Sequence, residues 1–352
     1  MSAVGNIAPY TKPLAPFYAA AVAARNWAYD RKVFKSGSVN VPVISVGNIT
    51  AGGNAKTPVT EYLVRYFLCR KITTGVLSRG YRRSTTGTIV VSDGKKLSGS
   101  PETAGDEPFQ IARKFHDTVV MVDEDRLRGA LEMCKMFHPG VIILDDGFQH
   151  RRLERDLDIV LIDGQELLAG LHYLPAGRLR ESLKSLRRAD VLILLNCADA
   201  FSEAVNIVGG HTDGRCFQGD IEAVSLTRLN SGEQLNVRDT PQKDCLAFCA
   251  IAKPKNFLST LQASGFVVKD FLGFIDHHSF TSGDYDRLGK KFRSSGAPMI
   301  ITTEKDAVRL DPERLFRVVP PEICYFLEIR FVLRKDESEF HSLLNQTVGA
   351  AA

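Results

Sequence analysis

The residues best suited to chemistry lie in one glycine-rich stretch, where Lys56 and Thr57 follow Gly52 and Gly53. An apolar, β-branched run at 41–46 precedes this stretch, and a helical pattern follows it. A phosphate-binding loop has this order: a strand, a glycine-rich turn, a lysine next to a hydroxyl residue, and a helix. Its backbone N–H groups surround the phosphates, the lysine reaches the outer ones and the hydroxyl holds Mg²⁺. The stretch predicts a nucleotide site, against the alternative of a strand-to-helix turn that binds nothing.

The loop departs from the usual pattern at two places. Ala55 stands before the lysine, where glycine is usual, and Thr50 stands at the leading glycine position. If the backbone at Ala55 is left-handed, it costs about 1–2 kcal/mol. The residues that we expect to contact the nucleotide are Asn48, Thr50, Gly52, Gly53, Asn54, Ala55, Lys56 and Thr57.

Two acidic sites follow along the chain. Asp145 and Asp146 end the apolar run at 140–144, and carboxylates at such a strand tip, downstream of a phosphate loop, handle Mg²⁺. The alternative for this Asp-Asp-Gly is a turn, but its combination with the lysine–threonine loop favours the metal. Asp106 opens a helical pattern, so it either caps that helix or accepts a proton.

His277 lies between an aspartate and a second histidine in a loop that follows an extended segment. It is either a surface residue, a metal ligand or an acid–base group. Consecutive Asp-His-His gives poor ligand geometry, so we favour acid–base work or the orientation of a carboxylate from the other domain.

Composition sets the class of protein. The chain has 352 residues, of which 44% are hydrophobic and 24% charged, as in a soluble globular protein with room for two domains. Its seven cysteines form no metal-type pair and are expected to be free thiols in a reducing cytosol. The net charge of +4 is carried entirely by the first 40 residues, which argues against a nucleic-acid-binding surface.

That N-terminal arm has an apolar run at 13–24, followed by Arg25, Trp27, Arg31 and Lys32. The run is shorter than the ~20 residues that a spanning helix needs. Aromatic and basic flanks suit a segment that lies in a membrane interface; the alternative is a helix packed on the domain.

Strands and helices alternate from residue 41 to 195, which predicts a mostly parallel α/β sheet with helices on both faces. Composition shifts near 200, and a second, smaller α/β domain follows. We therefore expect an arm at 1–35, a nucleotide-binding domain at 36–200 and a C-terminal domain at 201–352 that carries His277.

Seven motifs occur in one order: ISVGNITAGGNAKTP, SRGYRR, AGDEP, ILDDGFQHRRLERDLDIVLID, LPAGRLRE, FIDHHSF and TTEKDAVRL. Together they resemble the tetraacyldisaccharide 4′-kinase family of lipid A biosynthesis, over about residues 10–335. The resemblance implies a P-loop kinase at the cytoplasmic face of the bacterial inner membrane. It would use ATP and Mg²⁺ to phosphorylate the 4′-hydroxyl of an acylated disaccharide 1-phosphate, giving lipid IVA, with the arm on the membrane. No protein partner or nucleic acid is implied.

The resemblance also assigns roles to residues. Lys56 would hold the outer phosphates, with Asp106 as catalytic acid and His277 as its partner, joined by domain closure. The expected metal ligands are Thr57, Asp145, Asp146 and Glu181, and the expected substrate or phosphate contacts are Tyr81, Arg126, Gln149 and Arg180.

Two rival functions remain at this point. Ala55, and Ala252 where the family usually has glycine, leave open a non-catalytic nucleotide- or lipid-binding relative. A GTPase would need a guanine-selective NKxD motif, which the chain lacks.

Overall fold

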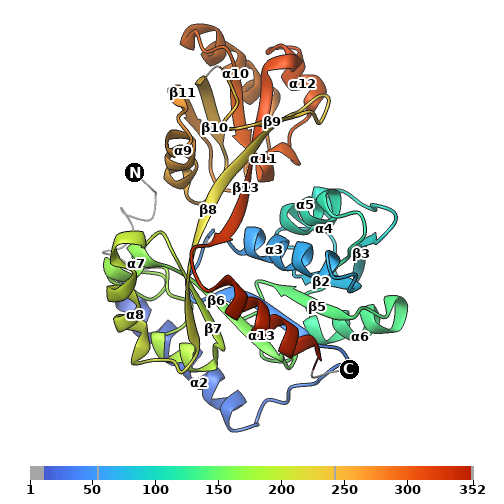
Figure 1. The fold of residues 1–352 in the computed structure, drawn as a ribbon, viewed down its shortest axis with the longest axis vertical. Coiled ribbons are helices and arrows are strands. Elements are labelled where there is room, and N and C mark those ends of the chain that lie inside the picture. Colours follow the sequence, from blue (N-terminus) through green and yellow to red (C-terminus); the bar gives the residue numbers. More distant parts are fainter. Residues whose placement is uncertain (1–11, 54, 242, 350–352) are drawn as a thin grey trace. The chain divides into compact units, whose positions relative to one another are not determined.

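The computed structural model describes residues 12–53, 55–241 and 243–349, which form two compact units (Figure 1). Unit 1 comprises Met1–Asp220 and Val332–Ala352, and unit 2 comprises Ile221–Phe331. The chain passes from unit 1 to unit 2 within β8 (Arg215–Arg228) and returns within β13 (Cys324–Leu333). The boundary predicted at 200/201 therefore differs from the observed one, because the start of β8 pairs with β7 and the last helix packs in unit 1.

The sheet of unit 1 has the strand order β7-β6-β1-β5-β2-β4-β3, and only β3 is antiparallel to its neighbour. Its central strands are buried along their whole length, which explains their continuous apolar runs. Because β1 lies between β5 and β6, the end of β1 meets the end of β5, with Val46 opposite Asp145. The bounds are β1 (Val43–Asn48), β2 (Thr74–Ser78), β3 (Ile89–Asp93), β4 (Val119–Val122), β5 (Val141–Asp145), β6 (Leu157–Asp163) and β7 (Val191–Leu195).

Helices cover both faces of this sheet, as predicted. Ile142 and Leu144 of β5 pack with Met133 of α6, whereas Asp145, on the opposite face of β5, meets Thr60 of α3. The helices are η1 (Lys12–Leu14), α2 (Ala15–Asp30), α3 (Lys56–Leu68), α4 (Pro101–Ala104), α5 (Asp106–Lys114), α6 (Arg126–Phe137), α7 (Gly164–Leu168), η2 (Leu183–Arg188), η3 (Ala198–Ala200), α8 (Phe201–Gly209) and α13 (Glu337–Gly349). Of these, η1, η2 and η3 are 3₁₀ helices.

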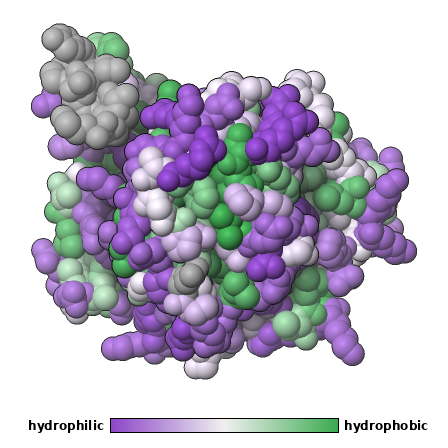
Figure 2. All heavy atoms as spheres, turned by 90° about the horizontal axis from the view of Figure 1, so that it is seen from above, coloured by the Kyte–Doolittle hydropathy of each residue, from purple (hydrophilic) through white to green (hydrophobic). Residues whose placement is uncertain are grey.

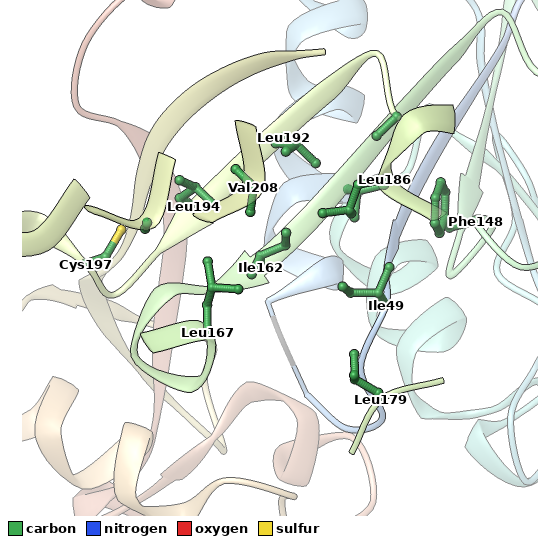
Figure 3. Close-up of a cluster of buried hydrophobic side chains, with 13 residues drawn as sticks. Ile49, Phe148, Ile162, Leu167, Leu179, Leu186, Leu192, Leu194, Cys197 and Val208 are labelled. Atoms are coloured by element: carbon green, nitrogen blue, oxygen red, sulfur yellow. The ribbon is translucent and has the colours of Figure 1, made fainter. Parts of the chain in front are cut away.

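A second apolar cluster fills the space over β6 and β7 (Figure 3). Ile162 and Leu192 of these strands pack with Leu167 of α7, Leu186 of η2 and Val208 of α8. Ile49, directly after β1, also belongs to this cluster. The chain that leaves β1 toward the phosphate loop is therefore anchored in the hydrophobic core.

The last helix, α13, packs beside the phosphate-loop helix α3 (Figure 1). The Tyr62 hydroxyl lies 2.7 Å from Nε2 of His341, and the Tyr66 hydroxyl donates to Asn345 at 2.8 Å. Phe340 is fully buried and meets Phe217 of β8 edge to face. These contacts make α13 an integral part of unit 1.

Unit 2 is built on the parallel strands β11-β10-β12-β13, and the end of β8 pairs with the short antiparallel β9. Cys245 and Cys249 of β10 point into an apolar cluster with α9, while Leu246 and Phe248 point into another with α10. The two cysteines are buried free thiols that form part of the core of unit 2. The bounds are β9 (Gln234–Asn236), β10 (Asp244–Cys249), α9 (Pro254–Ala263), β11 (Val267–Gly273), α10 (Ser282–Ser295), β12 (Ile300–Thr303), α11 (Glu304–Ala307), α12 (Pro312–Phe316) and η4 (Pro321–Ile323).

Hydrophilic side chains cover most of the face seen in Figure 2, and hydrophobic ones form small patches among them. Several large apolar side chains on and beside α2 are exposed, including Phe17 at 75%, Val33 at 61% and Trp27 at 58%. Within the described ranges, no helix has both the length and the hydropathy needed to cross a membrane.

Candidate functional site

The predicted phosphate loop connects β1 to α3 and is held in place by the segment at 178–181. Ala51 N–H donates to the Arg178 carbonyl at 2.6 Å, and Arg180 N–H donates to the Ile49 carbonyl at 2.8 Å. Thr50 pairs with Leu179 in an isolated antiparallel bridge. The LPAGRLRE motif therefore forms a backbone support for the loop, a contact that spacing in the sequence does not indicate.

Ala55 occupies the N-cap position of α3 with φ 56° and ψ 25°. This is the left-handed conformation that the sequence analysis considered, and for alanine it costs about 1–2 kcal/mol. The loop therefore keeps the backbone path that glycine usually provides, and the strain falls on Ala55.

Gly52 has a positive φ of 101°, and a Cβ there would lie 1.9 Å from Nη2 of Arg178. The guanidinium has little freedom to move away. Its Nε donates to the Ala51 carbonyl at 2.9 Å, and its Nη1 donates to Glu166 at 2.8 Å. Arg178 therefore lies against the phosphate loop and requires glycine at position 52.

We expect Gly52→Ala to lower the thermal midpoint by about 2–4 °C or more, because strain and displacement of Arg178 cost at least about 1–2 kcal/mol. Gly53→Ala is the matched control, since a Cβ at Gly53 meets nothing within 4 Å. Its stability should change by no more than about 0.5 kcal/mol. Calorimetric unfolding of both variants without nucleotide checks this; equal midpoints would contradict the role assigned to Arg178.

Lys56, Asp146 and Arg180 meet at the C-terminal ends of β1 and β5. Nζ of Lys56 lies 3.7 Å from Oδ1 of Asp146, and Nη1 of Arg180 lies 3.1 Å from both carboxylate oxygens of Asp146. Gln149 joins them: its Oε1 accepts from Arg180 at 3.3 Å, and its Nε2 donates to the Asn48 carbonyl at 2.8 Å. Four of the predicted site residues are thus brought together, two of them cations that suit phosphate oxygens.

The two adjacent carboxylates have opposite pKa shifts. Burial, followed by the charges of Glu107 and Asp146, raises the pKa of Asp145 to about 7, although Lys56 acts against this rise. Burial also acts to raise the pKa of Asp146, but Lys56 and Arg180 outweigh it and the pKa lies below its ordinary value. Asp146 is therefore ionised at neutral pH, whereas Asp145 is poised to ionise when a cation binds.

The surroundings of Asp145 fit a magnesium ion. Its carboxylate accepts hydrogen bonds from the Thr60 hydroxyl at 3.2 Å and the Ser78 hydroxyl at 3.4 Å, both neutral donors. Among the described residues, no three His, Cys, Asp or Glu side chains form a complete metal-binding group. That is compatible with Mg²⁺, which commonly takes one or two carboxylates and completes its shell with water and substrate phosphates.

Asp106 begins α5, and the N-cap of that helix is Gly105, so the capping role considered for Asp106 is not observed. The side chain of Asp106 is 9% exposed. Gly105 has φ 92°, and a Cβ on it would lie 3.1 Å from the backbone of Gly80 and 3.2 Å from the carbonyl oxygen of Tyr81. The acidic loop thus packs on the SRGYRR loop. The charge of Glu107, next to Asp106, contributes to the raised pKa of Asp145.

Arg126 is a buried cation, His150 is a half-buried histidine, and the charge of Asp146 acts on both. Arg126 is 2% exposed and donates from Nη1 to the Asp123 carbonyl at 3.1 Å. Burial lowers the pKa of Arg126 to about 10; Arg79 adds to this effect, while Asp146 opposes it. A buried guanidinium whose charge is only partly balanced favours a further anion.

The neutral state of His150 gives the fold a defined pH dependence. Burial, reinforced by Arg126, lowers the pKa of His150 to about 3, whereas an unfolded histidine titrates near ~6.5. The contribution of the neutral imidazole to the free energy of unfolding is therefore complete above pH ~6.5. Below that pH it falls, as the unfolded chain takes up a proton that the folded state refuses, by at most about 1.4 kcal/mol per pH unit.

His150→Gln should accordingly lose less stability than the parent protein between pH 6.5 and 4. Urea unfolding at pH 7, 6, 5 and 4 measures the two slopes, and parallel curves would show that His150 does not contribute.

Glu181 is fully buried, and its oxygens accept hydrogen bonds from Arg25 at 3.1 Å, Asn26 at 2.8 Å and Arg188 at 2.5 Å. The sequence analysis expected a metal ligand here. In the structure, three donors already surround the carboxylate, two of them from α2. Glu181 instead ties α2 to the loop that carries Arg180, which explains how an acid can be buried here. The Tyr18 hydroxyl supports the same junction by donating to the Arg180 carbonyl at 3.3 Å.

His277 belongs to unit 2 and lies in the loop after β11, with φ 60°. Its Nε2 is 3.2 Å from Nζ of Lys305, and its backbone N–H donates to the Ala250 carbonyl at 3.1 Å. His278 points elsewhere: its Nε2 lies 2.9 Å from Asp284. The two histidines have separate partners, which argues against a shared metal.

The remaining predicted residues are placed as follows. Asn48 is fully buried, and neither polar atom of its amide has a hydrogen-bond partner in the described part of the chain. Such a group favours a ligand. Thr57 is partly buried in the first turn of α3, Tyr81 is 53% exposed, and Asn54 lies outside the described residues.

The sequence analysis missed four contributors to this site: Thr60, Ser78, Glu107 and Arg178. Thr60 and Ser78 are polar residues at buried positions of α3 and β2, and that mismatch was the available signal. Glu107 adjoins Asp106. Arg178 had no local signal, because its partner in the phosphate loop, Ala51, lies more than 120 residues away in the sequence.

Comparisons with known proteins agree with this site. A family model described as tetraacyldisaccharide-1-P 4′-kinase matches residues 7–349. A tetraacyldisaccharide 4′-kinase of Chlorobaculum parvum is 38% identical over 90% of this chain and 89% of its own. That of Porphyromonas gingivalis is 35% identical over 95% of both. The crystal structure of LpxK from Aquifex aeolicus in complex with ATP superposes with a TM-score of 0.77 at 32% identity, covering 97% of this chain and 99% of that one.

Proposed function

Because this chain belongs to the tetraacyldisaccharide-1-P 4′-kinase family, we infer that it phosphorylates a lipid A precursor. It is an ATP-dependent phosphotransferase that moves the γ-phosphoryl group to the 4′-hydroxyl of the tetraacyldisaccharide 1-phosphate and so forms lipid IVA. The observation that carries this conclusion is the convergence of Lys56, Asp146 and Arg180 at the tip of the central strands, at the end of the phosphate loop. That arrangement suits a triphosphate.

The chain's own residues can carry out each part of the transfer. Lys56 and Arg180 hold phosphate oxygens and neutralise the charge that spreads over them in the loose transition state. Asp106 accepts the proton of the 4′-hydroxyl as its oxygen bonds to the γ-phosphorus and the bond to the β-phosphate oxygen breaks. His277 supports the same step by orienting a carboxylate. Arg126, Gln149 and Tyr81 are available for the substrate phosphate and sugar.

We assign Asp145, Asp146 and the Thr57 hydroxyl to Mg²⁺. These residues would hold the ion, which would supply positive charge to offset that of the phosphates. The raised pKa of Asp145 supports this assignment, since a buried carboxyl among neutral donors gains most from a cation.

A non-catalytic relative is the second candidate, and the strained Ala55 is the observation in its favour. The joint retention of Lys56, Asp106, Asp145 and His277 weighs against it, because a binding protein has no need for all four. Incubating purified protein with MgATP and the disaccharide 1-phosphate, followed by mass spectrometry, separates the two. A mass increase of one phosphate supports the kinase, and bound but unchanged lipid supports the alternative.

We propose that the protein works at the cytoplasmic face of the bacterial inner membrane, and that α2 binds to the membrane interface. Arg25 and Asn26 fix one side of α2 to Glu181, while Phe17 and Trp27 remain exposed. Exposed aromatic side chains next to basic ones favour the interface of an anionic bilayer. The acyl chains can then stay in the bilayer while the sugar is phosphorylated.

Replacing Phe17 and Trp27 together by glutamine should weaken binding to vesicles that contain anionic lipid by about 10–100-fold, because each side chain contributes up to about 1.5–3 kcal/mol when buried. Co-sedimentation measures the partition. Leu131→Gln with Met136→Gln is the matched control, since these α6 side chains are 50% and 52% exposed. An equal loss in both double variants would refute a specific role for α2.

A further inference from the structure

The motif TTEKDAVRL, at residues 302–310, has no part in the function described so far. Its centre is Asp306, a fully buried carboxylate on α11. Asp306 accepts hydrogen bonds from Ala250 N–H at 3.0 Å and the Thr303 hydroxyl at 2.6 Å, and it pairs with Arg309. A buried carboxylate supplied with this many donors forms a rigid anchor.

Arg309 extends the anchor to the loop that carries His277. Its Nη1 donates to the His278 carbonyl at 3.2 Å, and its Nη2 donates to the Ala250 carbonyl at 3.1 Å. That carbonyl also accepts the backbone N–H of His277 at 3.1 Å. The loop around His277 is therefore tied to the motif directly at the His278 carbonyl, and the His277 N–H shares the Ala250 carbonyl with Arg309.

The side chain of His277 is held by the same motif, through Lys305. Nζ of Lys305 lies 3.2 Å from Nε2 of His277, whereas the nearest oxygen of Asp276 is 3.9 Å away. A lysine ammonium has three donor hydrogens and no acceptor. Nε2 must therefore accept, and the proton of the neutral imidazole must be on Nδ1.

We propose that Lys305 is a positioning residue that holds His277 as the neutral Nδ1–H tautomer, with Nδ1–H as the one donor it offers to a carboxylate. Which ring nitrogen carries the proton is decided by the bond that the other nitrogen makes. The benefit to catalysis rests on the proposed function, because it requires that His277 orients the proton-accepting carboxylate. The tautomer itself does not depend on that function.

The test uses the full-length Lys305→Met and Lys305→Arg proteins. Methionine keeps the length of the side chain and removes the donor, whereas arginine keeps a cationic donor. Lys305→Met should lower kcat by about 10–100-fold, by analogy with the loss of a group that orients a metal-binding histidine. The KM for ATP should stay within about twofold, and Lys305→Arg should recover part of the rate. Lys269→Met is the matched control, because Lys269 is also in unit 2 and also ion-paired, to Asp244 at 2.9 Å, but is 44% exposed.

Long-range ¹H–¹⁵N spectra of protein labelled with ¹⁵N-histidine report the tautomer, and His277→Asn identifies the ring signals. The wild-type ring should show an unprotonated Nε2 and a protonated Nδ1, and Lys305→Met should shift this pattern toward a mixture. A protonated Nε2 in the wild type would overturn the proposal, even if Lys305→Met did not fold. So would an unchanged pattern in Lys305→Met, or a rise in KM for ATP at constant kcat. Absence of kinase activity in the wild type would instead refute the proposed function and leave the spectra to decide the tautomer.

Discussion

Asp106→Asn is expected to lower kcat by about 10²–10⁴-fold while the affinity for ATP changes little. Asparagine keeps the shape of the side chain but does not take up the proton of the acceptor hydroxyl, and general-base catalysis accounts for a rate factor of this size. Asp106 sits at the start of α5, and the phosphate-binding cations Lys56 and Arg180 both contact Asp146 at the tip of β5. Steady-state kinetics give kcat, and calorimetric titration gives the affinity for ATP.

Asp117→Asn provides the matched control, because Asp117 is an exposed aspartate of the same unit. It should have wild-type kinetics. His277→Ala should also lower kcat far more than ATP affinity, and combining it with Asp106→Asn should cost much less than the product of the two single effects. Wild-type kcat in purified Asp106→Asn would remove Asp106 from the mechanism, and multiplicative effects would separate His277 from it.

Lys56→Met is expected to reduce kcat/KM by about 10²–10³-fold or more, through both weaker ATP binding and slower transfer. Methionine has a similar length but no charge, so the outer phosphates lose a cation at the point where charge develops in the transition state. Asp146 would keep Arg180 at 3.1 Å, so the strand tip should remain folded. The effect is measured as kcat/KM at saturating lipid, with the thermal midpoint as a check on folding.

Lys135→Met on α6 is the control for the loss of a lysine, since Lys135 is exposed. If Lys56→Met bound ATP normally and turned over at the wild-type rate, Lys56 in the loop between β1 and α3 would not bind the triphosphate.

The sequence predicted the site best where the functional residues lie within a short, recognisable pattern of strand, loop and helix. The strand–loop–helix around Lys56 and the carboxylates at the tip of β5 follow from short-range patterns, and the structure brings Lys56 and Asp146 to 3.7 Å. The fold class of alternating strands and helices is confirmed, because each buried strand is a continuous apolar run. Element ends shifted by about two residues, as at β1, which runs over Val43–Asn48 instead of 41–46.

Contacts between distant segments could not be predicted. Arg178 packs against Gly52, and Arg25 and Asn26 cover Glu181, so each contact joins segments that are more than 100 residues apart. The sequence around Glu181 does not distinguish a glutamate that binds a metal from one that forms hydrogen bonds to a neighbouring helix. The domain boundary was mispredicted for a related reason, because unit 1 is built from two segments that lie on either side of unit 2 in the sequence.

That discontinuity has a consequence for how the protein is made. The helix α13 covers α3 through Tyr62 and Tyr66, yet it is synthesised after the whole of unit 2. A nascent chain that has left the ribosome only as far as Phe331 has its entire phosphate loop but not the helix that packs behind it. Unit 2 is an uninterrupted stretch, whereas the nucleotide-binding unit can reach its final state only after unit 2 and α13 have been synthesised.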